Sequence, residues 1–156
     1  MDLAAANAGR PGLSLPPADL CFHDHADRVE GLKVLLEHSG LQEACMAMAR
    51  HQEEDRDHWL RRLAWMEREP ELRGRRAALE ADYLEVLAGH FSRWGAAGPQ
   101  GERSAALEAA CVLGALRGAE RLWLQGQGRP ILPVLFQEAL SLVWPALYSH
   151  ARRHLK

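Results

Sequence analysis

Four side chains that could bind a metal lie near the middle of the sequence. His51, Glu54, Asp55 and His58 are spaced i, i+3, i+4 and i+7, so a continuous helix would place them along one side. Imidazole nitrogens and carboxylate oxygens are common ligands of transition metals. Helical di-iron sites, however, pair one Glu-x-x-His motif with a second on another helix, and no second copy is present. We therefore interpret this group as a solvated, charged turn, with a metal-binding or enzymatic helical bundle as the alternative function.

A second group mixes polar side chains with apolar ones on a predicted helix over 71–94. Arg76, Tyr83 and His90 keep the same side of this helix as its leucines. Polar groups on an inward face need partners, and two interpretations follow: the groups bond to neighbours and complete a core, or they line a ligand cavity, which is mostly apolar with a few convergent polar groups. The facing helix would supply the opposite wall, and large residues of a later helix the floor. The predicted lining comprises Gln52, Asp55, Trp59, Leu63, Met66, Arg76, Tyr83, Leu87, His90, Leu113 and Trp123.

The elements that must position these groups are all helical. Apolar residues recurring every three or four positions predict helices over 24–38, 41–67 and 71–94, followed by a Gly-rich loop over 95–101 and two apolar helices within 104–147. Pro70 can open the third helix, because first-turn amides have no intrahelical partner. The sequence thus predicts an all-α domain of about five helices over 20–156, preceded by a disordered tail over 1–19, where Ala, Gly and Pro follow no period.

The last two predicted helices are apolar over more than one side. One face of the first carries small residues, and Gly114 and Gly118 at i, i+4 each cost about 1 kcal/mol relative to Ala, so another backbone should approach there. Its bulky face, with Val112, Leu116 and Trp123, should fill a core. The surplus apolar surface predicts a homodimer, the alternative being a larger monomeric core. The expected interface comprises Cys111, Gly114, Gly118, Phe136, Leu140, Val143 and Leu147.

Composition argues against several functions. The net charge of −2 gives no basic stripe for nucleic acid, and no stretch is long and apolar enough for a membrane span. Cys21, Cys45 and Cys111 are scattered and odd in number, as free thiols are in the cytoplasm, where we expect the protein. No phosphate loop, zinc spacing or catalytic triad is present. We expect no enzyme activity, no cofactor and no membrane partner.

The order of these helices resembles a known family of regulators. The run ALEAACVLGALRGAERLWLQGQGRPILPVLFQEALSLVWPAL is similar to the last two helices of the TetR family of bacterial transcription repressors. The run EEDRDHWLRRLAWMEREPELRGRRAALEADYLEVLAGHF resembles the middle helices of a TetR subgroup, and the similarity spans about 26–147. It implies a C-terminal domain that binds a small effector and dimerises.

The same resemblance implies how such a domain acts. In the family, the effector shifts a population of conformations and changes the separation of two DNA-binding heads. The family's helix-turn-helix is not found in this sequence, so we expect DNA contact only through a module outside it, in a homodimer or a heterodimer with an intact relative. We expect a hydrophobic or aromatic effector, because a flexible Met and two aromatic rings line the predicted cavity. A structural dimerisation module without ligand is a further alternative.

Overall fold

The computed structural model describes residues 21–154, and this part of the chain consists of helices without a strand, which confirms the predicted all-α class. The helices are α3 (His25–His38), α4 (Leu41–Glu54), α5 (Arg56–Arg68), α6 (Pro70–Ser92), α7 (Pro99–Gln125) and α8 (Leu132–His154). The tail predicted over 1–19 lies outside the described residues. None of the described helices is both long enough and apolar enough to cross a membrane.

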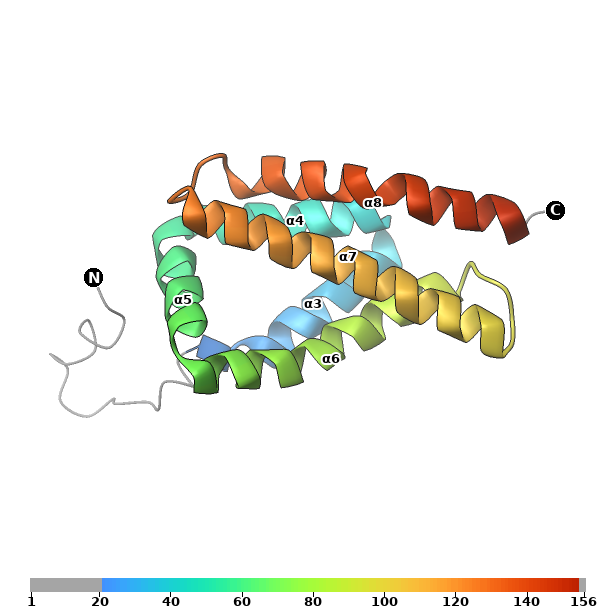
Figure 1. Ribbon diagram of the computed structural model, residues 1–156, viewed down its shortest axis with the longest axis horizontal. Helices are drawn as coiled ribbons and strands as arrows, with labels where there is room; N and C mark the ends of the chain where they lie inside the picture. Colours follow the sequence, from blue (N-terminus) through green and yellow to red (C-terminus); the bar gives the residue numbers. More distant parts are fainter. Residues whose placement is uncertain (1–20, 155–156) are drawn as a thin grey trace, which may run out of the picture.

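The predicted helix over 41–67 is two helices, so the prediction of one continuous helix was wrong. Asp55 lies between α4 and α5 with φ −119° and ψ 48°, which is not helical, and α5 leaves in a new direction (Figure 1). Asp is a weak helix former, and its neighbours here are polar. Both helices bury apolar residues on their inward faces, so apolar residues recur on each side of the break at similar spacing. The sequence pattern alone therefore did not reveal the break.

The turn between α7 and α8 packs on this junction. The backbone N–H of Leu132 donates to a carboxylate oxygen of Glu53 at 2.9 Å. Gly128 has φ +89°, and a Cβ there would lie 2.8 Å from Cδ of Arg56. The positive φ is the reason that glycine is favoured at position 128, while a Cβ there would also require the Arg56 side chain to shift.

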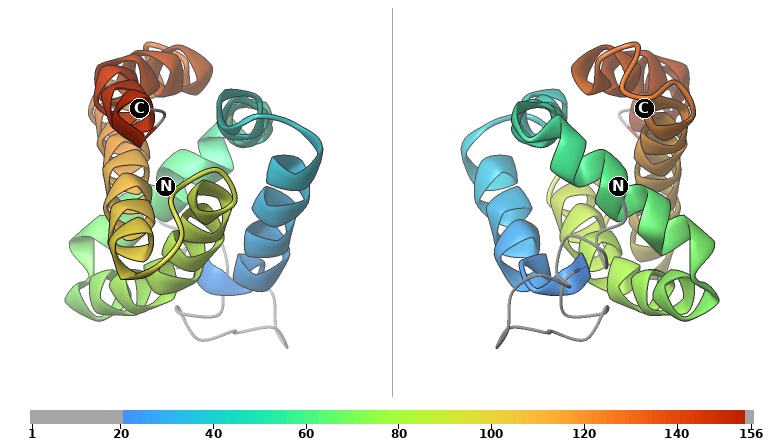
Figure 2. Two further views of the ribbon diagram at one scale, coloured as in Figure 1. Left: turned by 90° about the vertical axis from the view of Figure 1, so that its right-hand side faces the viewer. Right: turned by 90° about the vertical axis from the view of Figure 1, so that its left-hand side faces the viewer.

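On its inner side, α7 packs against α5, α6 and α8. In Figure 1, α5 joins the ends of α4 and α6, while α7 runs between α6 and α8. Figure 2 shows α3 on the side of the molecule opposite to α7. The bulky face of α7 is buried as predicted, with Val112 and Trp123 fully inaccessible and Leu116 6% exposed. The bulky face of α7 therefore forms part of the core.

Candidate functional site

A small cavity lies where α5, α6 and α7 meet the beginning of α3. Its volume is about 30 Å³, which is room for about two water molecules. The apolar part of its lining is formed by Cys21, Phe22, Trp59, Leu63, Met66 and Leu79. The rest of the lining is polar or charged and comprises His25, Arg28, Arg62, Arg76, Glu80, Tyr83, Arg117 and Glu120.

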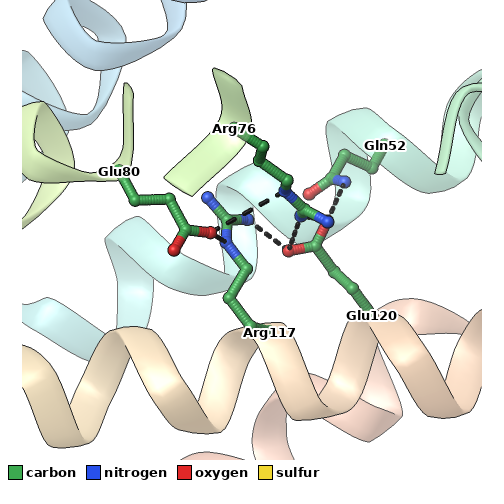
Figure 3. A network of polar contacts seen from close by, with 5 residues as sticks. All are labelled: Gln52, Arg76, Glu80, Arg117 and Glu120. Carbon is green, nitrogen blue, oxygen red and sulfur yellow. Dashed lines mark hydrogen bonds and ion pairs between the residues drawn. The ribbon is translucent and has the colours of Figure 1, made fainter. Parts of the chain in front are cut away.

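Glu120 of α7 is a fully buried carboxylate in the cavity wall. Its side chain is 3% exposed and accepts hydrogen bonds from Nε2 of Gln52 at 3.3 Å and from the guanidinium groups of Arg76 and Arg117 (Figure 3). Burial alone would raise the pKa of Glu120, but Arg117 and Arg76 overcome this effect and lower that pKa to about 2. The carboxylate is therefore ionised at any physiological pH.

A second carboxylate, Glu80 of α6, bonds to the same two arginines. Arg117 Nε donates to Glu80 Oε1 at 2.6 Å, and Arg76 Nε lies 3.7 Å from the same oxygen. Burial would lower the pKa of Arg117, but Glu120 and Glu80 raise it above its ordinary value. Arg76, Glu80, Arg117 and Glu120 thus form a closed set of alternating charges, which we call the charge ring (Figure 3).

Two further arginines lie on the opposite wall, stacked on one aromatic ring. The guanidinium carbon of Arg28 is 4.2 Å, and that of Arg62 4.4 Å, from the ring centroid of Trp59. Arg62 is paired with Asp24 through two hydrogen bonds of 3.1 and 2.5 Å. Within 21–154 no carboxylate forms an ion pair with Arg28, and burial lowers the pKa of that arginine. Arg28 therefore brings to the cavity a positive charge that makes no direct ion pair, although the carboxylate of Glu120 acts on it from farther away.

The cavity wall also holds hydrogen-bond donors that no protein group satisfies. The hydroxyl of Tyr83 and the Nε of Arg62 are buried and have no partner among the described residues. Tyr83 is 4% exposed, and its ring contacts His25 edge to face at 5.4 Å. Such groups cost free energy unless something accepts their hydrogen bonds.

The charge ring separates this cavity from a larger cleft on the surface. The cleft has a volume of about 260 Å³ and shares with the cavity the charge ring together with Leu63 and Met66. Ala77 and Leu124 add further apolar lining. A ligand in the cleft would therefore contact apolar side chains of α5 and α7 and the outer side of the charge ring.

The structure brings together part of the predicted ligand-binding set. Trp59, Leu63, Met66, Arg76 and Tyr83 all line the cavity. They come from α5 and α6, the two helices predicted to face each other.

The other predicted residues lie elsewhere. Gln52 contacts the site only through Glu120, and Asp55 is exposed at the α4–α5 junction. Leu87, Leu113 and Trp123 are buried in the core and do not line the cavity. His90 lines a separate groove beside Lys33 and Arg93, and burial together with Arg93 lowers its pKa. The break at Asp55 explains part of the difference, since it turns α5 away from the line of α4.

The sequence interpretation missed the charges that define the site: Arg28, Arg62, Glu80, Arg117 and Glu120. For Glu120, the sequence does contain a signal. Glu120 follows Leu113 by seven and Leu116 by four residues and precedes Trp123 by three, so it lies on the face predicted to fill the core. A carboxylate on such a face must be paired.

The group His51, Glu54, Asp55 and His58 is divided by the same break. The first two belong to α4 and His58 to α5. Among the residues that the structure describes, no three His, Cys, Asp or Glu side chains are placed to hold a metal ion.

The residues predicted at a dimer interface divide into two sets. Cys111, Gly114 and Gly118 are exposed on α7, and a Cβ at either glycine would meet no atom within 4 Å. Phe136 and Leu140 are 2% and 3% exposed and belong to the core, while Val143 and Leu147 are half-buried. The exposed apolar residues of α8 are instead Val134 and Leu142. The α7 side of the expected interface is therefore open, whereas its α8 side packs within the chain.

Residues 37–148 match a family model of TetR C-terminal domains, described as the MftR C-terminal domain. The match begins near the end of α3, contains α4 to α7 and extends through most of α8. Neither a curated protein nor a solved structure matches the chain.

Proposed function

Since the chain belongs to the TetR C-terminal family described as the MftR C-terminal domain, we propose that it binds a small effector and dimerises as the regulatory part of a transcription regulator. The family is one of regulatory domains, so an enzymatic role is not proposed. A DNA-reading module outside the described residues would make the DNA contacts, and the cytoplasm is the compartment in which such a regulator acts.

The observation that carries the effector-binding role is the cleft between α5, α6 and α7. Four apolar side chains, Leu63, Met66, Ala77 and Leu124, line it together with seven charged ones from α5, α6 and α7. The cleft is thus more charged than most small-molecule sites, and this mixture suits an amphipathic ligand. At about 260 Å³ it is smaller than the roughly 300 to 1,000 Å³ of sites for drug-sized ligands. We therefore expect a small amphipathic effector with a hydrophobic or aromatic body.

A thermal-shift screen of small aromatic and aliphatic compounds tests this role. A ligand present at 100 times its dissociation constant should add about 2.7 kcal/mol to the free energy of unfolding. Ala77→Trp should abolish the shift, because position 77 lines the cleft and is itself exposed, so the indole can fill the cleft without entering the core. Ala78→Trp is the matched control, since Ala78 is the next residue on α6 and is exposed but does not line the cleft.

Two results of this screen would contradict the proposed role. One is the lack of any ligand across a chemically broad screen. The other is a shift that survives Ala77→Trp, which would place the ligand elsewhere.

The dimerisation role rests on the outer side of α7. Leu107, Cys111, Gly114, Gly118 and Leu122 form one exposed stripe, in which the two leucines are 68% and 56% exposed. The glycines cost helix stability without serving the packing of this chain, since nothing lies near a Cβ at either position. We propose that α7 of a second copy crosses this stripe, with Val134 and Leu142 of α8 beside it. Light scattering at micromolar concentration should give twice the chain mass, and a clean monomer would contradict the proposal.

A further inference from the structure

The charges that line the cavity do not balance. The charge ring contains two guanidinium groups and two carboxylates, Glu80 and Glu120. Arg62 is neutralised by Asp24. Arg28 remains, and its guanidinium faces the same cavity while stacked on Trp59. The lining therefore holds four arginines against two glutamates, while two carboxylates outside the lining, Asp24 and the exposed Asp82, are paired with Arg62 and His25.

Two buried groups at this place have no hydrogen-bond partner among the described residues: the Nε–H of Arg62, which can only donate, and the hydroxyl of Tyr83, which can donate to an anion. The guanidinium of Arg28 lines the same cavity and makes no direct ion pair within residues 21–154. Tyr83 and Arg62 are 4% and 3% exposed, so their donors cannot turn to bulk solvent. Donors with excess positive charge favour an anion over a neutral or cationic group.

From this arrangement we infer that the cavity binds the carboxylate of an organic monoanion, whose apolar body lies in the adjoining cleft. The carboxylate would lie between Arg28 and Tyr83, on the inner side of the charge ring. This inference rests on the proposed effector-binding function of the cleft and names the chemical class of the effector.

Size and existing contacts favour a carboxylate over a phosphate. The cavity of about 30 Å³ has room for a head group of only a few atoms. Arg76 and Arg117 already hold the carboxylates of Glu80 and Glu120, which shows that carboxylates suit the donors of the charge ring. Glu80 is the more exposed of the two carboxylates, at 27% against 3% for Glu120, and it lines both the cleft and the cavity.

The test compares acids with their neutral amides on the full chain. The probes are hexanoate, octanoate and 4-phenylbutanoate, each with its primary amide and its phosphonate, measured by isothermal titration calorimetry. The carboxylates should bind about tenfold or more tightly than the amides, because hydrogen bonds to a charged acceptor are lost in the amide. Equal affinity for acid and amide overturns the inference, and so does binding of neutral compounds alone. Either result still supports the cleft as a ligand site. Tighter binding of the phosphonates overturns the choice of a carboxylate.

Two variants locate the charge selectivity. Arg28→Gln should reduce carboxylate affinity to near that of the amide. It removes the attraction of Arg28 to Glu120 as well as its repulsion with Arg62 and Arg117, so circular dichroism checks that the variant is folded. Arg75→Gln is the control, on an exposed position of α6 outside the site. Tyr83→Phe removes a hydroxyl that has no protein partner and should weaken carboxylate binding about threefold to tenfold. Unchanged acid selectivity in both site variants overturns the inference.

Discussion

The two sides of α7 reverse the usual distribution of side chains. Toward α5 and α6, this helix presents Arg117 and Glu120 in the interior, whereas on its outer side Leu107 and Leu122 stand in solvent. Scattered exposed leucines are ordinary, but buried charges and contiguous exposed apolar residues are the informative exceptions. Both exceptions lie where we propose that the domain meets another molecule, an effector on one side and a second copy on the other.

The energetic consequences of the two sides differ. Burying a charge costs several kcal/mol, and partners must offset that cost within the same chain. Exposing a leucine costs much less and needs no partner inside the chain. The charge ring should therefore affect the stability of the monomer, whereas the outer stripe should affect only assembly. Four predictions test this difference.

Glu120→Ala should have the largest effect. It removes the buried carboxylate that Arg76 and Arg117 share and leaves these half-buried arginines only Glu80. Removing one partner of a buried ion pair costs about 3 to 5 kcal/mol in the free energy of unfolding. Urea denaturation followed by circular dichroism measures the loss. Glu138→Ala, at an exposed position of α8, is the control and should stay within about 0.5 kcal/mol of the wild type. A loss below about 1 kcal/mol for Glu120→Ala would mean that the charge ring contributes little to the fold.

Acid should weaken the protein through the same carboxylate. The pKa of Glu120 is lowered from 4.5 to about 2 in the folded state, so its contribution is complete above pH 4.5 and is lost as the pH falls toward 2. By linkage this amounts to about 3 kcal/mol of unfolding free energy. Urea titrations between pH 2 and pH 7 measure it. Glu120→Gln should lose this part of the pH dependence, and an unchanged slope in that variant would assign the acid sensitivity to other carboxylates.

Gly118→Leu should weaken the dimer without weakening the monomer. A side chain there blocks the approach of a second backbone. Overpacking of about 1 to 3 kcal/mol corresponds to a dissociation constant about fivefold to 150-fold higher. The monomer should be as stable as the wild type or more so, by less than about 1 kcal/mol, because Leu is the better helix former. Analytical ultracentrifugation measures the dissociation constant. Gly74→Leu on α6, where a Cβ also meets no atom within 4 Å, is the control; equal effects of the two variants would argue against the α7 interface.

Thiol labelling should report the smallest effect. Cys111 is exposed on the outer stripe, whereas Cys21 and Cys45 are buried. Burial raises the pKa of both buried thiols, that of Cys45 to about 12, so Cys111 should be the thiol that a maleimide modifies in the native protein. Its rate should fall as the protein concentration rises through the dimer transition. Cys111→Ser should remove the native reaction, and a rate independent of concentration would place Cys111 outside the interface.

The sequence by itself determined the helical class, most of the helix boundaries and the buried face of α7. These features depend on residues close in sequence: the apolar period defines a face, and Pro70 marks the beginning of a helix. The same period placed Trp59, Leu63 and Met66 on one side, and these residues do line the cavity. It also distinguished the small face of α7, with Gly114 and Gly118, from the bulky one.

The tertiary structure decided which faces meet. The pairing of Glu120 with Arg76 joins residues 44 positions apart in sequence, and no local pattern states which arginine a buried carboxylate will contact. Phe136 and Leu140 were expected at the surface of the chain but lie in the core, since α8 packs on both α4 and α7. Helical periodicity gives the angular position of a residue around the axis of its helix. It does not say which other helix lies at that angle. The direction of each neighbour depends on turns such as the break at Asp55, and a single non-helical residue there redirects all of α5.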